Sequence, residues 1–361
     1  MKINSLKLKN FRNYDLLSLE FDPATNIFYG DNAQGKTNIL ESVYLCATTK
    51  SHRGTKDRDL IQFEKDESHI EVLVEKKGMV HQIDMHLKKN SPKGIAINKI
   101  PIRKASELFG IINIVFFSPE DLNIIKNGPS ERRRFVDLEL SQLDRVYLSN
   151  LSNYNRIVNQ RNHLLKDIYR QNSLIDTLDI WDLQLIEYGT KIIEARKIFI
   201  EQVNEIISGI HRKLTGERED LFLIYEPNTG NYTLEQALIK NRERDLRMQS
   251  TSVGPHRDDV CFQSGNIDIR KFGSQGQQRT AALSLKLAEI EMVKRITRDK
   301  PVLLLDDVLS ELDKHRQNYL LDSIDDIQTL ITCTGVDEFV NHRFSINKIF
   351  HVHEGQVTGE N

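Results

Sequence analysis

A glycine-rich segment near the start of the chain constrains the fold more than any other feature. Residues 30–37 read GDNAQGKT and match the phosphate-binding pattern GxxxxGK[ST]. The segment follows the apolar run IFY and precedes NILESVYLCA, which has the composition of a helix. Because such a loop requires a strand before it and a helix after it, the segment predicts an α/β nucleotide-binding domain.

Each part of this P-loop has a physical role in holding a triphosphate. The glycines let backbone N–H groups turn towards the phosphates, and the helix N-terminus adds its dipole. Lys36 neutralises charge on the β- and γ-phosphates, and the Thr37 hydroxyl ligates Mg²⁺. We therefore expect ATP and Mg²⁺ as cofactors. The predicted nucleotide-binding residues here are Gly30, Asp31, Asn32, Ala33, Gln34, Gly35, Lys36, Thr37 and Asn38.

Two carboxylates at the end of a second apolar run complete the predicted site. Residues 302–305 read VLLL, as in a buried central strand of a parallel sheet, and Asp306 and Asp307 follow at its carboxyl end. We predict Asp306 as a metal ligand and Asp307 as the general base for the attacking water. Lys36 and Asp307 are thus the candidate catalytic residues. Two acids after an apolar run also occur at ordinary strand ends, so this signal depends on the P-loop.

Two further segments indicate the class of ATPase. FGSQGQQRT (272–280) precedes the VLLLDD run and leads into a helix-like stretch, and SELD (310–313) follows it. In this order they resemble the ABC ATPase superfamily, in which a signature loop opens a helix and a D-loop follows the paired acids. The resemblance implies that Ser274 and Gly276 contact the γ-phosphate held by a second subunit. Taken alone, SQGQ has the more usual meaning of a helix cap.

Six segments narrow the resemblance to the RecF family of bacterial recombination-repair proteins. They are KNFRNY (9–14), SHRGTKDRDLI (51–61), FSPEDLNIIKNGPSERRRFVD (117–137), TSVGPHRDD (251–259), SQGQQRT (274–280) and LLLDDVLSELD (303–313). The resemblance implies an ATP-dependent homodimer that binds double-stranded DNA and single/double-strand junctions. It also implies work with RecR and RecO to direct RecA to gapped DNA, in replication, repair and SOS induction.

The sequence departs from the generic ABC pattern at two places. Asp307 stands where a catalytic glutamate is usual, and the side chain that is one methylene shorter fits slow, DNA-stimulated hydrolysis used as a conformational switch. No Q-loop glutamine is evident, and Asp121 occupies a similar stretch, so metal ligation from that loop stays open. Thr332 or Thr334 is the candidate switch residue near the final strand.

The apolar pattern changes along the chain in a way that predicts an inserted lobe. Residues 131–216 contain no proline, and their apolar residues recur at helical spacing. We predict an ABC-type P-loop ATPase head of the α/β class, assembled from residues 1–130 and 217–361, with a helical lobe at 131–216 between them.

Charge gives no global signal for DNA. The chain has 50 Lys plus Arg against 52 Asp plus Glu, a formal charge of −2, so DNA binding depends on local clusters. The candidates are Arg132–Arg134 and a loop group of Arg53, Lys56 and Arg58, each balanced by acids that favour a solvated face instead. Arg12 and Asn13 are predicted to support the adenine or ribose, with a buried strand-end arginine as the equal alternative for Arg12.

Several classes of protein are disfavoured. The three cysteines are far apart and form neither a disulfide framework nor a CxxC site, and no stretch reaches the ~20 apolar residues of a membrane span. We expect a cytoplasmic protein with no membrane partner. A structural or ATP-sensing role is expected for His256, and no zinc site for His351 and His353, since two ligands are too few.

Two alternatives remain open. The first is an SMC- or Rad50-like head with a structural role in chromosomes, although two helices sharing the ~80 residues of the insert would reach only ~60 Å, too short for the arms of those proteins. The second is a transporter ATPase subunit, which would carry a clear Q-loop.

Overall fold

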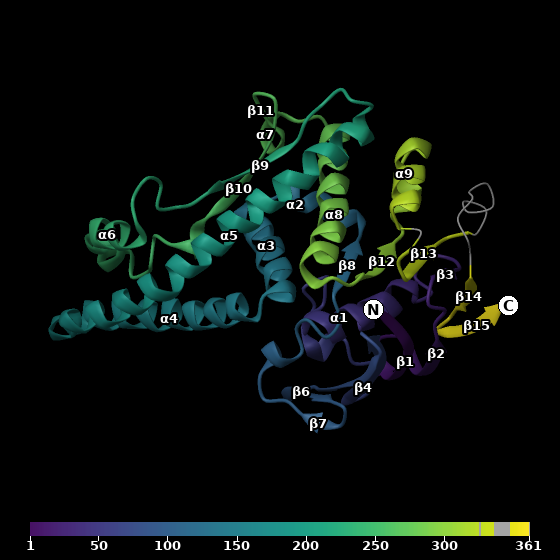
Figure 1. Ribbon diagram of the computed structural model, residues 1–361. Coiled ribbons are helices and arrows are strands. Elements are labelled where there is room, and N and C mark those ends of the chain that lie inside the picture. The colour runs from purple at the N-terminus through teal and green to yellow at the C-terminus, as the bar shows by residue number, and fades with distance from the viewer. Residues whose placement is uncertain (325, 336–346, 361) are drawn as a thin grey trace. The chain divides into compact units, whose positions relative to one another are not determined.

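The chain forms two compact units in the computed structural model, which describes residues 1–324, 326–335 and 347–360 (Figure 1). The first unit comprises Met1–Asp121 and Lys286–Asn361, and the second comprises Leu122–Leu285. Both ends of the chain therefore contribute to the first unit, as the prediction of a head with an inserted lobe requires. The expected insert of 131–216 covers only part of the second unit.

The first unit contains a six-stranded sheet in the order β15-β14-β3-β13-β12-β8. Its strands are β3 (Thr25–Tyr29), β8 (Ile114–Phe117), β12 (Val302–Asp306), β13 (Thr329–Cys333), β14 (Lys348–His353) and β15 (Gln356–Glu360). All neighbours pair in parallel except β15, which is antiparallel to β14. Every residue of β8, β12 and β13 is buried, as expected for parallel strands covered on both faces. The carboxyl ends of five strands therefore share one edge.

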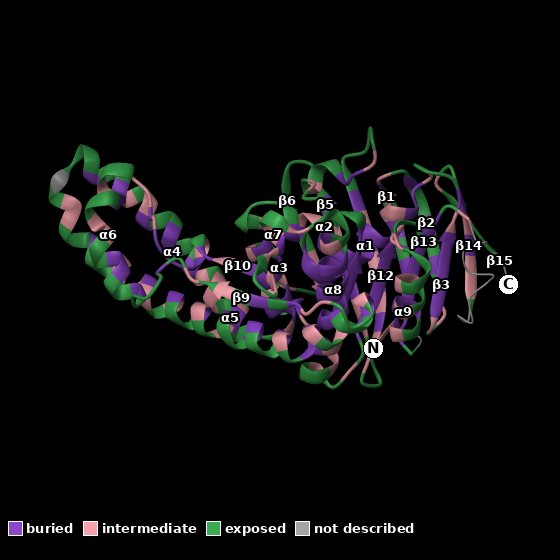
Figure 2. Cartoon of the chain, turned by 90° about the horizontal axis from the view of Figure 1, so that it is seen from above, coloured by how far each residue is buried: buried purple, intermediate pink, exposed green. Residues whose placement is uncertain are grey.

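A second sheet of the first unit is antiparallel throughout, in the order β2-β1-β4-β5-β6-β7. Its strands are β1 (Lys2–Phe11), β2 (Tyr14–Glu20), β4 (Glu67–Lys76), β5 (Met79–Lys88), β6 (Ser91–Ile97) and β7 (Ile100–Pro101). Helix α1 (Lys36–Thr48) contacts strands of both sheets and buries 11 of its 13 residues (Figure 2). The helix that carries the P-loop lysine is thus held on all sides. Helix α9 (Lys314–Ile324) completes this unit with the end of α8 (Gln275–Thr297).

The second unit combines a helical hairpin with a small sheet. Its helices are α2 (Leu122–Lys126), α3 (Pro129–Leu143), α4 (Arg145–Arg170), α5 (Leu178–Thr215), α6 (Leu234–Met248), α7 (Ile269–Phe272) and the start of α8. Its sheet has the order β11-β10-β9, with strands β9 (Phe222–Glu226), β10 (Asp259–Ser264) and β11 (Ile267–Asp268). Helices α4 and α5 pack side by side (Figure 1). The 38 residues of α5 extend about 57 Å at 1.5 Å per residue.

Buried charge organises the second unit around the segment GPHRDD. Arg196 of α5 donates to Asp137 of α3 at 2.7 Å, to the Pro255 carbonyl at 2.7 Å and to Asp258 at 3.3 Å. His256 lies between the Tyr154 hydroxyl, 2.8 Å from Nδ1, and the Thr251 carbonyl, 3.1 Å from Nε2. These partners fit a neutral ring with its proton on Nε2, which is a structural role.

The half-buried ring of His256 predicts that the stability of the protein falls in mild acid. Burial lowers the pKa of His256 to about 4, whereas an unfolded histidine titrates near about 6.5. As the pH falls, the unfolded chain therefore takes up the proton first. The contribution of neutral His256 to the free energy of unfolding is complete above about pH 6.5 and is lost as the pH falls towards about 4. Between pH 7.5 and 5, the free energy of unfolding of His256→Gln should fall by about 2 kcal/mol less than that of the native protein. Urea unfolding at the two pH values measures this difference. Parallel pH profiles of the two proteins would contradict this.

Candidate nucleotide-binding site

The P-loop joins the carboxyl end of β3 to the start of α1 in a backbone conformation that needs its glycines. Gly30 has φ 147° and Gly35 has φ 114°, in the region that side chains rarely adopt. A Cβ atom at Gly30 would lie 2.2 Å from the Val352 carbonyl oxygen, and one at Gly35 would lie 2.5 Å from the amide of Asn13. Backbone conformation and close contacts within the chain therefore require glycine at both positions of the loop.

Lys36 is the first residue of α1, and its side chain turns back over the loop. The ammonium donates to the carbonyl of Gly30 at 2.5 Å and to that of Asp31 at 2.7 Å. Burial lowers the pKa of Lys36, while nearby acids, with Asp307 first among them, act in the opposite direction. The cation is thus presented at the centre of the loop, where a phosphate would be neutralised.

The Thr37 hydroxyl and Asp306 meet although they are 269 residues apart in the chain. The Thr37 hydroxyl donates to Asp306 Oδ1 at 2.7 Å, and the Thr332 hydroxyl donates to the same oxygen at 2.7 Å. Burial raises the pKa of Asp306, and these two hydrogen bonds oppose that rise. A hydroxyl and a carboxylate at one point are the hard oxygen ligands that Mg²⁺ takes together with phosphates and water. The residues present therefore fit the predicted cation.

Asp307 has a backbone conformation that is uncommon outside glycine, with φ 53°. Its N–H donates to the Thr332 hydroxyl at 3.1 Å, and its carboxylate accepts from the Ser310 hydroxyl at 3.4 Å. Thr332 therefore contacts both acids, which gives β13 a direct connection to them. Ser310 begins the SELD segment, so the predicted base and the predicted D-loop are also in contact.

Asn13 and Asn38 support the loop from its side. The Asn13 amide donates to the Gln34 carbonyl at 2.9 Å and accepts from the Asn38 amide at 2.8 Å. The β14–β15 turn adds a contact that sequence reasoning missed, since the Glu354 N–H donates to Gln34 Oε1 at 2.6 Å. These contacts organise the P-loop, and direct binding of nucleotide by Asn13 and Asn38 stays a prediction.

Arg12 makes the contacts expected of a structural arginine at the end of a strand, which was the alternative to binding adenine or ribose. Its guanidinium makes a bidentate pair with the buried carboxylate of Glu41 in α1, at 2.9 and 3.0 Å, and donates to Thr55 at 3.2 Å. Burial alone would raise the pKa of Glu41, but the hydrogen bonds from Arg12 and Ser51 and the charge of Arg12 together outweigh it, so this pKa lies below its usual value. Arg12 therefore anchors α1 to β1, and its contact with adenine or ribose also stays a prediction.

Ser274 and Gly276 lie at the exposed start of α8. Ser274 forms a reciprocal cap with Gln277: its hydroxyl accepts from the Gln277 N–H at 3.2 Å, and its own N–H donates to the Gln277 side chain at 2.9 Å. Among the described residues, the heavy atom nearest to a Cβ atom placed at Gly276 would be Ser274 Oγ, at 3.9 Å. Glycine weakens a helix, and packing within the chain does not require it at this position. The open space beside Gly276 leaves room for a group from outside the chain.

Two of the three arginines at the start of α3 contact groups within the chain, whereas Arg134 is exposed. Arg132 is 4% exposed and pairs with Asp259 at 2.6 Å, so the prediction of a DNA contact is wrong for this residue. Arg133 donates to the Asp258 carbonyl at 2.7 Å. By contrast Arg53, Lys56 and Arg58 are exposed, and DNA contact by this group stays a prediction.

Asp121 follows β8 at the same sheet edge as the two acids. Its carboxylate accepts from the Ser118 N–H at 2.9 Å, and burial raises the pKa of Asp121 to about 7. The side chain is thus committed to its own loop.

Among the described residues, no group of three or more His, Cys, Asp or Glu side chains could hold a metal, and no helix is long and apolar enough to cross a membrane.

Comparison with known proteins now identifies the family. A family model described as the RecF/RecN/SMC N terminal domain matches residues 2–358. The chain is 62% identical over 357 residues to the DNA replication and repair protein RecF of Agathobacter rectalis, covering 99% of both chains. The chain belongs to the RecF family. RecF of Lachnospira eligens is likewise 62% identical, over 363 residues and the full length of both chains. This chain is thus similar to DNA replication and repair proteins along its whole length.

Solved structures agree with this family and with the ATPase fold. The structure of the recombination mediator protein RecF-ATP in the RecFOR pathway has a TM-score of 0.93 and 36% identity, and the match covers 100% of this chain and 98% of that one. An Smc head domain from Pyrococcus furiosus has a TM-score of 0.58 at 16% identity over 99% of this chain and 96% of that one. The second likeness shows a shared head fold, and the RecF family membership removes the transporter alternative.

Proposed function

We propose that this chain binds ATP with Mg²⁺ at the P-loop and uses it to close two copies into a dimer that holds duplex DNA. The observation that carries the proposal is the 2.7 Å contact of Thr37 with Asp306, which joins the P-loop to the acid at the end of β12. Lys36 would neutralise the β/γ charge, and Thr37 and Asp306 would hold the cation. The RecF-ATP structure at 36% identity supports ATP as the nucleotide.

The signature segment supports action between two copies. Ser274 and Gly276 are exposed at a helix N-terminus, which is a favourable place for a phosphate, and Gly276 has open space beside it. We infer that they contact the γ-phosphate of the neighbouring copy. Asp307 would then act as the base, and its short side chain suits slow hydrolysis that opens the dimer.

The cellular role that we propose follows the family. The ATP-bound dimer would bind double-stranded DNA and single/double-strand junctions at gaps, and with RecR and RecO it would direct RecA to the gapped strand. The exposed group of Arg53, Lys56 and Arg58 is a candidate phosphate contact, because each cation placed against the DNA backbone releases counterions.

Fluorescence anisotropy of a labelled short duplex tests this proposal. With ATP and Mg²⁺ the duplex should be retained, with ADP it should not, and the affinity should fall steeply with salt because the contacts are to phosphates. Equal retention with ATP, with ADP and without nucleotide would reject ATP-dependent closure.

Asp307→Asn should separate closure from hydrolysis. The substitution keeps the size of the side chain and removes the base, while Thr37 and Asp306 still hold the cation. We expect at least about a hundredfold loss of ATP turnover together with a longer-lived dimer on DNA. Turnover by quenched flow and dimer lifetime by light scattering measure the two effects. A monomeric variant with normal turnover would show that Asp307 is not the base.

A further inference from the structure

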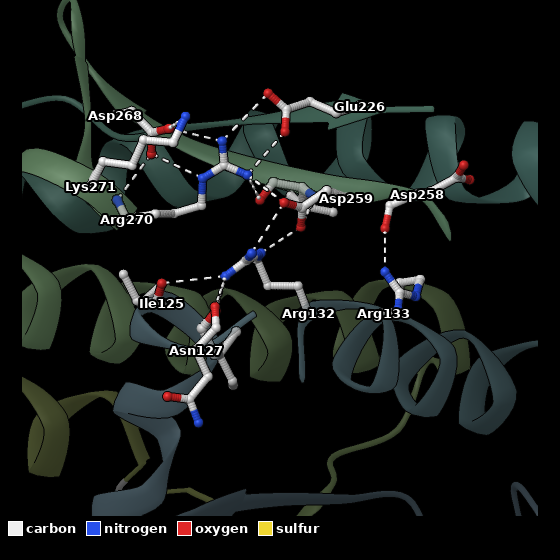
Figure 3. Close-up of polar contacts among 12 residues, drawn as sticks. Ile125, Asn127, Arg132, Arg133, Glu226, Asp258, Asp259, Asp268, Arg270 and Lys271 are labelled. Carbon is white, nitrogen blue, oxygen red and sulfur yellow. Dashed lines mark hydrogen bonds and ion pairs between the residues drawn. The ribbon is translucent and has the colours of Figure 1, made fainter. Parts of the chain in front are cut away.

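The short helix in front of the signature segment is anchored by charge. Arg270 lies in α7, four residues before Ser274. Its guanidinium pairs bidentately with Asp268, at 2.9 and 2.8 Å, and its Nη1 atom also contacts Asp259 at 2.8 Å and Glu226 at 2.9 Å (Figure 3). Hydrogen bonds from Arg270 lower the pKa of Asp268 to about 2. Carboxylates from all three strands of the small sheet therefore hold this one side chain.

Asp259 is shared with a second arginine. Arg132 of α3 pairs with it at 2.6 and 3.1 Å, and the remaining Nη1 atom of Arg132 donates to the carbonyls of Ile124, Ile125 and Asn127 at 3.2, 3.3 and 2.7 Å (Figure 3). These carbonyls lie at the carboxyl end of α2, where a cation is favoured. Arg132, Asp259 and Arg270, here called the ion-pair link, thus connect α2 to α7.

The turn between α7 and α8 transmits the position of α7 to the signature residues. The Gly273 N–H donates to the Ile269 carbonyl at 3.2 Å, and the buried Gln278 amide donates to the same carbonyl at 3.1 Å. A Cβ atom at Gly273 would lie only 2.7 Å from that oxygen. Because these contacts hold the turn tightly, the orientation of α7 determines the position of Ser274.

Helix α2, at the other end of the ion-pair link, follows directly in the chain on the last segment of the first unit. Helix α2 begins at Leu122, immediately after the segment Ser118–Asp121 that follows β8. The chain therefore runs from the sheet edge that carries Asp306 into the helix that Arg132 caps. Planar guanidinium forks fix both distance and angle, whereas a single ammonium contact would not.

We propose that the ion-pair link is a positioning device that holds the signature segment in the orientation needed to contact the nucleotide of a second copy. Its residues bind no nucleotide themselves. The inference rests on the proposed function, because it concerns the same ATP-dependent dimer. It predicts that loss of the ion-pair link leaves nucleotide binding at the P-loop intact and weakens closure of the ATP-dependent dimer.

Arg270→Gln tests the ion-pair link, with Arg242→Gln as the matched control. Arg242 of α6 pairs with Asp179 at the start of α5 in the same unit, also as an arginine–aspartate pair. We expect Arg270→Gln to bind a fluorescent ATP analogue within about twofold of the native protein while its ATP-dependent dimer weakens at least about tenfold, the effect of losing one charge-assisted hydrogen bond. Arg270→Lys keeps the charge without the fork and should be intermediate. Arg242→Gln should dimerise normally.

Mixing experiments separate mispositioning from misfolding. Arg270→Gln damages only the signature half of the composite site, so mixing it with Lys36→Arg protein should restore ATP-dependent dimers through one intact site. Mixing it with Ser274→Arg should not, since both proteins lack a working signature half. Arg132→Gln should behave as Arg270→Gln does, and the double variant should add little because both act through Asp259.

The outcomes are distinguishable from failure of the proposed function. If the native chain does not dimerise with ATP, or if Lys36→Arg and Ser274→Arg do not complement each other, the proposed function fails. If both of those hold but Arg270→Gln dimerises as the native protein does, or is rescued by neither partner, the ion-pair link has no positioning role. A loss of nucleotide analogue binding in folded Arg270→Gln would also overturn it.

Discussion

Lys36→Arg should abolish ATP hydrolysis, with a loss of at least about a hundredfold, the size seen when one group that stabilises developing charge is removed. The Lys36 ammonium fits between the carbonyls of Gly30 and Asp31, at 2.5 and 2.7 Å. A planar guanidinium is larger and its donors point in fixed directions, so it cannot occupy that position. Nucleotide affinity should be weakened or partly retained, since positive charge remains. Single-turnover hydrolysis and analogue binding measure the two effects.

Lys300→Arg is the matched control for this substitution. Lys300 pairs with Asp326 at 2.6 Å on the surface of the same unit, and its replacement should leave turnover unchanged. If Lys36→Arg also hydrolyses ATP at the native rate, the assignment of residues 30–37 as the phosphate site is wrong.

Ser274→Arg should prevent ATP-dependent dimerisation, duplex binding and hydrolysis together. A long cation would occupy the place where a small hydroxyl and the open space at Gly276 meet the neighbour's γ-phosphate. Nucleotide binding to the monomer should survive, because Lys36 and Thr37 are unchanged. Light scattering with and without ATP, alongside binding of a fluorescent analogue, shows whether the losses separate in this way.

A mixture of Ser274→Arg and Lys36→Arg tests action between copies. Their heterodimer has one composite site with both halves intact and one with both halves damaged, so partial recovery of association is expected. Normal ATP-dependent dimerisation of Ser274→Arg alone would mean that SQGQ is only the cap that it forms with Gln277.

The local patterns of the sequence were sufficient to predict which residues meet at the candidate nucleotide site. The P-loop has a fixed spacing, and beside it the VLLL run indicates a buried parallel strand that places Asp306 at the carboxyl edge of the sheet. Thr37 and Asp306 were therefore predicted to converge, and the structure places them 2.7 Å apart. Motifs whose chemistry depends on spacing along the chain are visible in one sequence.

Partners that lie far apart in the chain were not predictable. The run of three arginines predicts a DNA contact for Arg132, yet its carboxylate partner Asp259 lies 127 residues away. A single sequence records the charge and not the pairing. For the same reason the link from Arg132 to Arg270 was missed, and the bidentate pair of Arg12 with Glu41 was only an unresolved alternative.

The extent of the insert was also hidden. Helical spacing identified the region of α4 and α5, but the strands β9, β10 and β11 follow the helices in sequence and belong by contacts to the same unit. Periodicity predicts the type of an element and does not say against which unit its apolar face packs. The second unit consequently reaches Leu285, well beyond the expected boundary at residue 216.

The mass of the native protein in solution tests the central claim most directly. Light scattering coupled to size-exclusion chromatography should give a monomer of about 42 kDa with ADP, a dimer of twice that mass with ATP and Mg²⁺, and co-elution of a short duplex with the dimer alone. Asp307→Asn should increase the dimer fraction under the same conditions. A monomer under all nucleotide conditions, or duplex bound equally by the monomer, would contradict an ATP-closed dimer as the DNA-binding form.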